Sequence, residues 1–120
     1  MFIFRNKPVS ILFIAGLFAM AFSAPALAAI SYAGSWHAYF DGNLTGTCQI
    51  KVTPTGAMSG HCKGKYMAPF LVRGKMVGDK VRFSDDSTGG VFSGVMVSGV
   101  HGIGHWQNGQ ASGDWYIRKN

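Results

Sequence analysis

The segment from Val100 to Arg118 reads VHGIGHWQNGQASGDWYIR and determines more of the expected fold than any other part of the chain. At its centre, Asn108-Gly109 between two patterned runs is the strongest short-range signal for a β-hairpin. On either side lie the triplets Gly104-His105-Trp106 and Gly113-Asp114-Trp115. Residues two apart in a strand share a face, so each triplet sets a glycine beside an indole on one side of a sheet.

A third triplet of this kind, Gly34-Ser35-Trp36, lies near the other end of the chain, which suggests that the first and last strands are built alike and meet where a sheet closes on itself. Turn signals separate further short runs between them. The expected strands are Gly34–Phe40, Thr47–Thr53, Met58–Tyr66, Phe70–Val77, Lys80–Ser84, Val91–Val97, Val100–Gln107 and Ala111–Arg118. We therefore predict an all-β fold, an antiparallel up-and-down meander of about eight strands that forms a small closed or nearly closed barrel.

Residues 1–28 have the features of a cleaved secretory signal peptide. Arg5 and Lys7 give it a basic start, an apolar run follows, and Ala26-Leu27-Ala28 fits a cleavage site. The apolar run is short for a membrane anchor, the alternative interpretation. We expect a single domain of residues 29–120, in the periplasm or outside the cell. Without Arg5 and Lys7, nine basic residues face five acidic ones, a net charge of +4.

The only two cysteines, Cys48 and Cys62, lie in the exported part, where an even number favours a disulfide. Pro54-Thr55-Gly56 reads as the turn between their strands. If the turn centres on Thr55, the numbers of paired residues sum to 110, and the two cysteines face each other. We expect a structural disulfide rather than a redox or metal role.

The same pairing arithmetic predicts an inward face for each strand. In the last hairpin a sum of 217 places Gly102 opposite Trp115, so that the glycine makes room for the ring. Two interpretations of the interior stay open. Side chains could fill it, or it could hold a small ligand among Trp36, Trp106 and Trp115, because an eight-stranded barrel can do either.

The outward face of the central strands is basic. This predicted basic face consists of Lys51, Lys63, Lys65, Arg73, Lys75 and Arg82. Lys75 faces Arg82, and like charges on paired strands are destabilising, so an anionic partner could compensate them. The alternative is a solubilising face. So many cations also argue against a lipid-facing surface, and we expect a chain that neither spans a membrane nor binds nucleic acid.

A second outward region is expected to be apolar. Pair sums of 197 and 217 bring together the predicted patch of Phe92, Met96, His101, Ile103, His105 and Tyr116. Such a patch often marks a protein contact or an oligomer interface. It could also be covered by a second sheet or a loop, or hold copper through methionine and histidine.

The sequence gives little support for catalysis. It contains no glutamate, and its aspartates lie mainly in expected turns such as Asp41-Gly42 and Asp85-Asp86. Hydrolase, metalloprotease and phosphate-binding motifs do not occur. We predict a protein that is not an enzyme, with no catalytic residue, metal or cofactor, although folding could still assemble a Ser/His/Asp site.

Two family resemblances follow from short motifs. Ala33-Gly34-Ser35-Trp36-His37-Ala38, Cys48-Gln49-Ile50 and Gly60-His61-Cys62 resemble the opening of bacterial periplasmic protease inhibitors of the Inh type. That resemblance implies an eight-stranded barrel with one disulfide, whose N-terminal segment, here Ala29–Ala33, enters a metalloprotease cleft. The Gly-Xaa-Trp triplets of the second half are similar in texture to avidin-like barrels, which implies a small ligand among the tryptophans.

Together these features predict an exported, soluble module that binds and does not catalyse. An inhibitor-like or protein-binding function is the leading hypothesis. The alternatives are a small-ligand carrier with a tryptophan-lined cavity and an envelope-associated structural oligomer.

Overall fold

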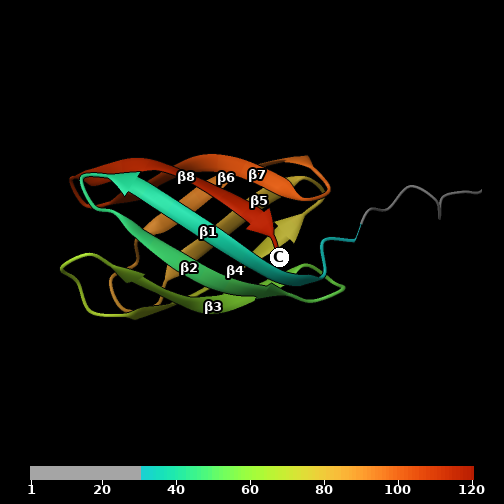
Figure 1. Cartoon of the computed structure of the whole chain (residues 1–120), viewed down its shortest axis with the longest axis horizontal. Coiled ribbons are helices and arrows are strands. Elements are labelled where there is room, and N and C mark those ends of the chain that lie inside the picture. The colour runs from blue at the N-terminus through green and yellow to red at the C-terminus, as the bar shows by residue number, and fades with distance from the viewer. Residues whose placement is uncertain (1–30) are drawn as a thin grey trace, which may run out of the picture. The chain divides into compact units, whose positions relative to one another are not determined.

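A computed structural model describes residues 31–120, which form one barrel of eight strands (Figure 1). The expected signal peptide, together with Ala29 and Ile30, lies outside the described residues. The strands are β1 (Gly34–Gly42), β2 (Gly46–Val52), β3 (Ala57–Gly64), β4 (Phe70–Val77), β5 (Lys80–Asp85), β6 (Val91–Ser98), β7 (His101–Asn108) and β8 (Ala111–Lys119).

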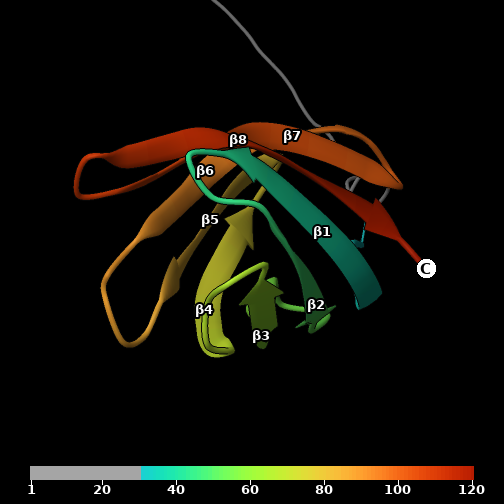
Figure 2. The same ribbon diagram turned by 60° about the vertical axis from the view of Figure 1, so that its left-hand side comes forward.

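Every strand pairs antiparallel with its neighbours in the sequence, and β8 pairs with β1 to close the barrel. Figure 2 shows the strands curving around a common interior. The closing ladder includes Phe40 opposite Trp115 and Ala38 opposite Ile117. The predicted all-β, eight-stranded antiparallel meander is confirmed, and so is the meeting of the first and last strands.

The hairpin of β2 and β3 has the predicted register, with Cys48 opposite Cys62 and a disulfide between them. Its turn ends at Gly56, whose φ of 92° is readily available only to glycine. Both cysteines are buried, so the crosslink lies inside the barrel wall and joins two strands at core level.

The register of the last hairpin differs from the prediction by two residues. Trp115 faces Gly104, and Gly102 faces Ile117. The turn consists of Gly109 and Gln110 rather than Asn108 and Gly109, with a positive φ at Gly109 alone. This is the pattern of a type II′ turn, which needs glycine only at its first central position. A shift of two residues keeps every side chain on its predicted face.

The register of the hairpin of β6 and β7 differs from the prediction by one residue, and this difference changes which side chains are buried. A bulge between Met96 and Ser98 moves the pairing so that Phe92 faces Trp106 and Met96 faces Gly102. A slip of one residue exchanges the two faces of a strand. Phe92 and Met96 are therefore buried in the core, and the prediction that they face outward is wrong. Val95 faces outward for the same reason and is 43% exposed.

The interior holds one continuous apolar core built from inward positions of all eight strands. Its buried members are Tyr32, Trp36, Ala38, Phe40, Cys48, Ile50, Val52, Met58, Cys62, Val72, Met76, Val81, Phe83, Phe92, Met96, Trp106, Trp115 and Ile117. On the inner face of the barrel, large aromatic rings on one strand lie opposite glycines on the neighbouring strand. At Gly104 a Cβ atom would lie 2.7 Å from the Trp115 ring and 2.1 Å from the carbonyl oxygen of Ser93. Glycine is required there because the ring and the neighbouring backbone occupy the space of a side chain.

Asp85 is the single buried charged residue among residues 31–120, and it organises the loop between β5 and β6. Its carboxylate accepts hydrogen bonds from the backbone and hydroxyl of Ser87, both at 2.7 Å, and from the hydroxyl of Thr88 at 2.7 Å. Burial raises the pKa of Asp85, but these hydrogen bonds outweigh burial and hold the pKa below its ordinary value.

We expect Asp85→Asn to lower the free energy of unfolding by about 1–3 kcal/mol at neutral pH, because charge-assisted hydrogen bonds are lost from a buried site. The folded pKa lies below the unfolded one, so the advantage of the wild type is complete above about pH 4 and disappears as the pH falls through the folded pKa. Urea unfolding between pH 2 and 7 measures this. Asp86→Asn is the control, since Asp86 makes only an exposed ion pair with Arg73. An advantage that persists undiminished at pH 2 would contradict the prediction.

Candidate functional site: an outer groove across six strands

The three tryptophans of the predicted ligand cavity are all buried in the core: Trp36, Trp106 and Trp115. Their indole N–H groups donate to backbone carbonyls of Tyr32, Asp41 and His105, respectively, at 2.8–2.9 Å. Each indole thus has its hydrogen-bond partner within the barrel itself.

The predicted basic face is exposed throughout, and Lys75 lies opposite Arg82 as expected. Arg73 is the member with an ion pair among the described residues, to Asp86 at 2.9 Å. The hydrogen bond and the charge of Asp86 raise the pKa of Arg73. The other five cations have no acidic partner within residues 31–120, so the face is strongly positive.

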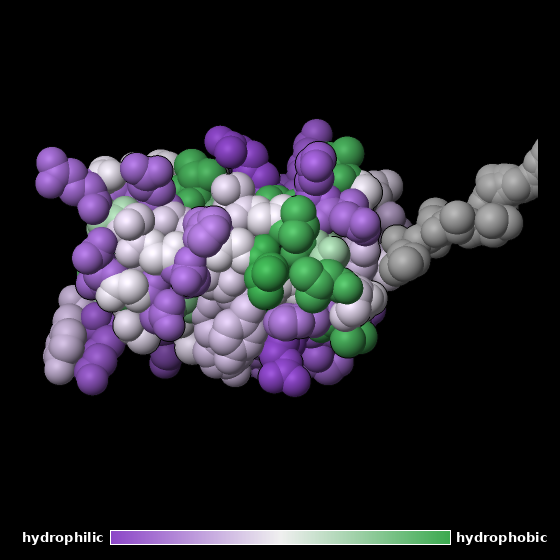
Figure 3. Space-filling view, turned by 90° about the horizontal axis from the view of Figure 1, so that it is seen from above, coloured by the Kyte–Doolittle hydropathy of each residue, from purple (hydrophilic) through white to green (hydrophobic). Residues whose placement is uncertain are grey.

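The predicted apolar patch is only partly formed. His101, Ile103, His105 and Tyr116 lie on the outer face, but Phe92 and Met96 do not join them. Because of the bulge in β6, Val95 takes the outward place beside Ile103. In the view from above, apolar side chains form a compact cluster surrounded by polar ones (Figure 3).

An open groove with a volume of about 1130 Å³ crosses the outer face, and each of its strands contributes to it in the same way. Each of six strand segments contributes three consecutive residues, of which the middle one points into the barrel and the outer two stand on the surface. The triplets are Tyr39–Asp41, Thr45–Thr47, Lys63–Lys65, Ser93–Val95, Ile103–His105 and Asp114–Tyr116. The backbone of the middle residues is the floor, and the two outward rows are the walls.

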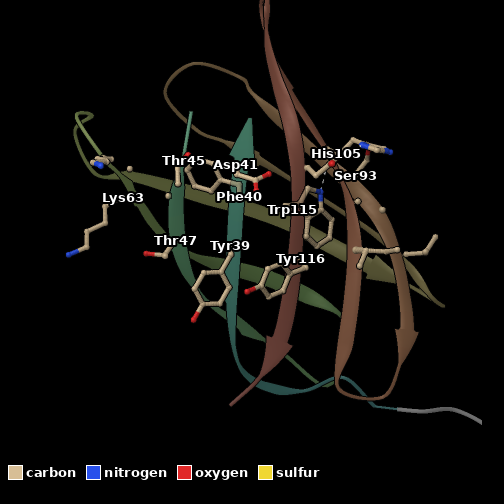
Figure 4. Close-up of a pocket in the computed structure, with 18 residues that line it drawn as sticks. Tyr39, Phe40, Asp41, Thr45, Thr47, Lys63, Ser93, His105, Trp115 and Tyr116 are labelled. Carbon is tan, nitrogen blue, oxygen red and sulfur yellow. Dashed lines mark hydrogen bonds and ion pairs between the residues drawn. The ribbon is translucent and has the colours of Figure 1, made fainter. Parts of the chain in front are cut away.

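One wall is apolar and aromatic. Cross-strand pairs place Val95 beside Ile103, Ile103 beside Tyr116 and Tyr116 beside Tyr39. The two tyrosine rings lie side by side in Figure 4; their centroids are 5.0 Å apart and their planes differ by 23°. Both tyrosines are more than a third exposed. They form a flat aromatic platform on the outside of the barrel, and Thr47 continues this apolar wall on β2.

The opposite wall is polar. Ser93 pairs with His105, His105 with Asp114 and Asp114 with Asp41 across four adjacent strands. Nδ1 of His105 lies 2.6 Å from a carboxylate oxygen of Asp114. Among residues 31–120 no hydrogen bond joins Ser93 to His105. The carboxylates, imidazole and hydroxyls of the row can hydrogen-bond a ligand.

Four of the six floor positions are glycines: Gly46, Gly64, Gly94 and Gly104. Their alignment at one level depends on the observed register, in which Gly94 faces Gly104 and Gly46 faces Gly64. Here the backbone of one strand comes within 2.0–2.1 Å of where Cβ of Gly94 or Gly104 would stand. Such close approach lets the sheet coil tightly beneath the groove.

The groove is not predictable from single hairpins, because it joins residues of six strands. The glycine spacing is a signal in the sequence, but it becomes informative only when the β6 bulge and the β7–β8 register are known.

Scans of protein-family descriptions, curated proteins and solved structures find no match for this chain. The resemblances to Inh-type inhibitors and avidin-like barrels therefore stay predictions. Within residues 31–120, no helix has the length and apolar character to cross a membrane. In the same part of the chain, no three histidine, cysteine or acidic side chains are grouped as a metal site would require.

Proposed function

We propose that this chain is a non-catalytic binding module, and that its binding surface is the outer groove. The observation that carries the proposal is the pair of unlike walls, one aromatic and one polar, along one open groove. Ligand sites commonly combine aromatic surface with a few hydrogen-bonding groups. The buried disulfide is compatible with an oxidising compartment, so we place this function in the periplasm or outside the cell.

The inhibitor-like hypothesis has weaker support from the geometry. The resemblance assigns protease binding to Ala29–Ala33, but the described part of this segment is tied to its own barrel. The Tyr32 hydroxyl donates to Asp79 at 2.7 Å, which raises the pKa of Tyr32, and Nζ of Lys119 donates to the carbonyl of Ala33 at 2.7 Å. A segment held in this way has less freedom to enter another protein's cleft.

The small-ligand carrier also has weaker support, because the three tryptophans are packed in the core and have backbone partners. For a structural oligomer, the exposed Val95 and Ile103 are the favourable feature, and both line the groove. A structural oligomer and a general protein-binding function would therefore both use the groove.

Hydroxyl-radical footprinting tests whether the groove is the binding surface. We expect oxidation of Tyr39 and Tyr116 to fall when the purified domain is mixed with an envelope or culture-supernatant extract of the cells that produce it. Leu71 and Val77 are the controls, because both are more than 60% exposed on β4 and neither lines the groove. Equal oxidation of the tyrosines with and without extract would contradict the proposal.

A further inference from the structure

We propose that the groove binds an acidic polysaccharide, a chain of sugar rings that carries carboxylate groups. This inference rests on the proposed use of the groove and names the chemistry of its occupant. Four features of the surface lead to it: the length of the groove, the aromatic wall, the polar wall and the cations at both ends.

The groove is shaped for an elongated chain. It crosses six neighbouring strands in the order β3, β2, β1, β8, β7, β6. Five inter-strand spacings of about 4.8 Å give a contour of about 24 Å, measured along the curved wall of the closed barrel. A compact metabolite would occupy a fraction of this contour, whereas a polymer that follows the wall can contact several strands in succession.

The aromatic wall fits the faces of sugar rings. The C–H groups on one face of a pyranose form an apolar surface, and their slightly positive hydrogens pack well against the negative face of an aromatic ring. Tyr39 and Tyr116 offer two nearly parallel rings for this contact. Val95 and Ile103 extend the same wall by two strands, so that successive rings of a chain have apolar surface to rest on.

The polar wall fits the hydroxyl groups that edge such rings. Carboxylates accept hydrogen bonds from hydroxyls, and serine or threonine hydroxyls can donate or accept. Asp41, Ser93 and Thr45 present these groups along the groove (Figure 4), and Asp114 also lines it. The Asp41 carboxylate makes no hydrogen bond to another group within residues 31–120, so it is available to a ligand.

The closed barrel disfavours an extended peptide as the occupant. Peptides in sheet grooves are held mainly by main-chain hydrogen bonds to a free strand edge. Here the closed barrel pairs every strand on both sides and leaves no such edge. The backbone of the floor is paired within the barrel, so the side chains of the two walls supply the hydrogen-bonding groups, which suits a polymer recognised through its rings and hydroxyls.

Cations at both ends of the groove indicate that the polysaccharide it binds is negatively charged. Lys63 and Lys65 end the two walls at β3, and both line the groove. At the other end, the ladders place Lys80 beside Val95 and Arg82 beside Ser93. None of these four side chains has an ion pair within residues 31–120. Lys80 and Arg82 lie on β5, just beyond the groove, so a carboxylated polymer would meet positive charge as it enters or leaves. Its carboxylates would lie towards these ends, because Asp41 and Asp114 in the middle of the polar wall accept hydrogen bonds from hydroxyls and repel like charge.

The test measures binding of three carboxylated hexasaccharides, from polygalacturonate, polymannuronate and hyaluronate, by isothermal titration calorimetry at low and physiological salt. We expect at least one to bind. Tyr39→Ala/Tyr116→Ala should weaken that binding by about tenfold or more, because the aromatic platform is removed. Lys63→Gln/Lys65→Gln should weaken it by a comparable factor at low salt and by less at physiological salt, because screening already reduces the charge contribution.

Two controls separate ring recognition from simple charge attraction. Lys51→Gln/Lys75→Gln removes the same charge from the basic face outside the groove and should change the affinity by less than about twofold. Hexaglutamate carries similar charge without sugar rings, and cellohexaose carries rings without charge. Neither should bind with an affinity comparable to that of the acidic hexasaccharide. Thermal unfolding shows whether each variant is folded.

Comparable binding of hexaglutamate would overturn the inference, because charge alone would then suffice, and comparable binding of cellohexaose would overturn the acidic character. Failure of all three acidic sugars would also overturn it. If the extract still protects Tyr39 and Tyr116 from oxidation in that case, the groove remains the binding surface and only the identity of its occupant is wrong. Loss of that protection as well would contradict the proposed function itself.

Discussion

Cys48→Ala/Cys62→Ala is expected to lower the free energy of unfolding by about 3 kcal/mol, the value for a crosslink that closes a loop of about fifteen residues. The cysteines are 14 positions apart, and both are buried opposite each other on β2 and β3. The crosslink restricts the unfolded chain. Without it, the unfolded chain has more conformational entropy, and folding must overcome a larger entropy loss. A domain of this size has a total stability of only about 5–15 kcal/mol, so the loss is large.

Urea unfolding of the oxidised wild type, the reduced wild type and the double variant measures this effect. The reduced wild type keeps both sulfur atoms, so its stability isolates the crosslink from the change in core volume. Dithiothreitol should destabilise the wild type and leave the variant unchanged. A reduced wild type as stable as the oxidised one would show that the disulfide contributes nothing to folding.

The same hairpin shows why part of the fold could be predicted from the sequence. Its strands alternate apolar and polar residues, as in Cys48, Ile50 and Val52 against Gln49 and Lys51. Pro54 and Gly56 fix the turn, and no bulge intervenes. With one face clearly apolar and one turn clearly placed, only one register buries the right side chains.

The β6 strand shows why the rest could not be predicted. Its sequence from Val91 to Val97 is apolar on both faces, since Phe92 and Met96 alternate with Val95 and Val97. Either register buries apolar groups, so the alternation does not choose between them. The choice is made by the bulge and by the fit of Phe92 against Phe83, whose rings stack at 4.6 Å. Phe83 and Phe92 are partners on the neighbouring strands β5 and β6, so this contact is not visible in the pattern of the β6–β7 hairpin alone.

The groove depends on that same choice. If Phe92 and Met96 faced outward, the triplet of Ser93, Gly94 and Val95 would turn over and interrupt both walls. Predicting the candidate site therefore requires the register of β6 against both of its neighbours, while predicting the barrel requires only the turns and the alternation of apolar and polar residues. The basic face was predictable because charged residues on a solvated face keep their side whichever partner strand they meet.

We expect Trp115→Ala to lower the free energy of unfolding by about 3–5 kcal/mol, the range for removing a large aromatic side chain from a core. The Trp115 ring is 3% exposed, lies edge-on to Phe83 at 5.4 Å and donates to the carbonyl of His105 at 2.9 Å. Gly104 has no side chain that could move into the space. The variant would therefore leave a cavity in the middle of the barrel.

Tyr116→Ala is the matched control, one residue further on the same strand and on the opposite face. Tyr116 is 38% exposed and makes its main contact with the exposed Tyr39, so its loss should cost less than about 1 kcal/mol. Urea unfolding of the two variants beside the wild type gives the difference. A small cost for Trp115→Ala would mean that the ring lies loosely in a hollow interior, which would favour the small-ligand carrier. A large cost supports a filled barrel, whose binding then takes place at the outer groove.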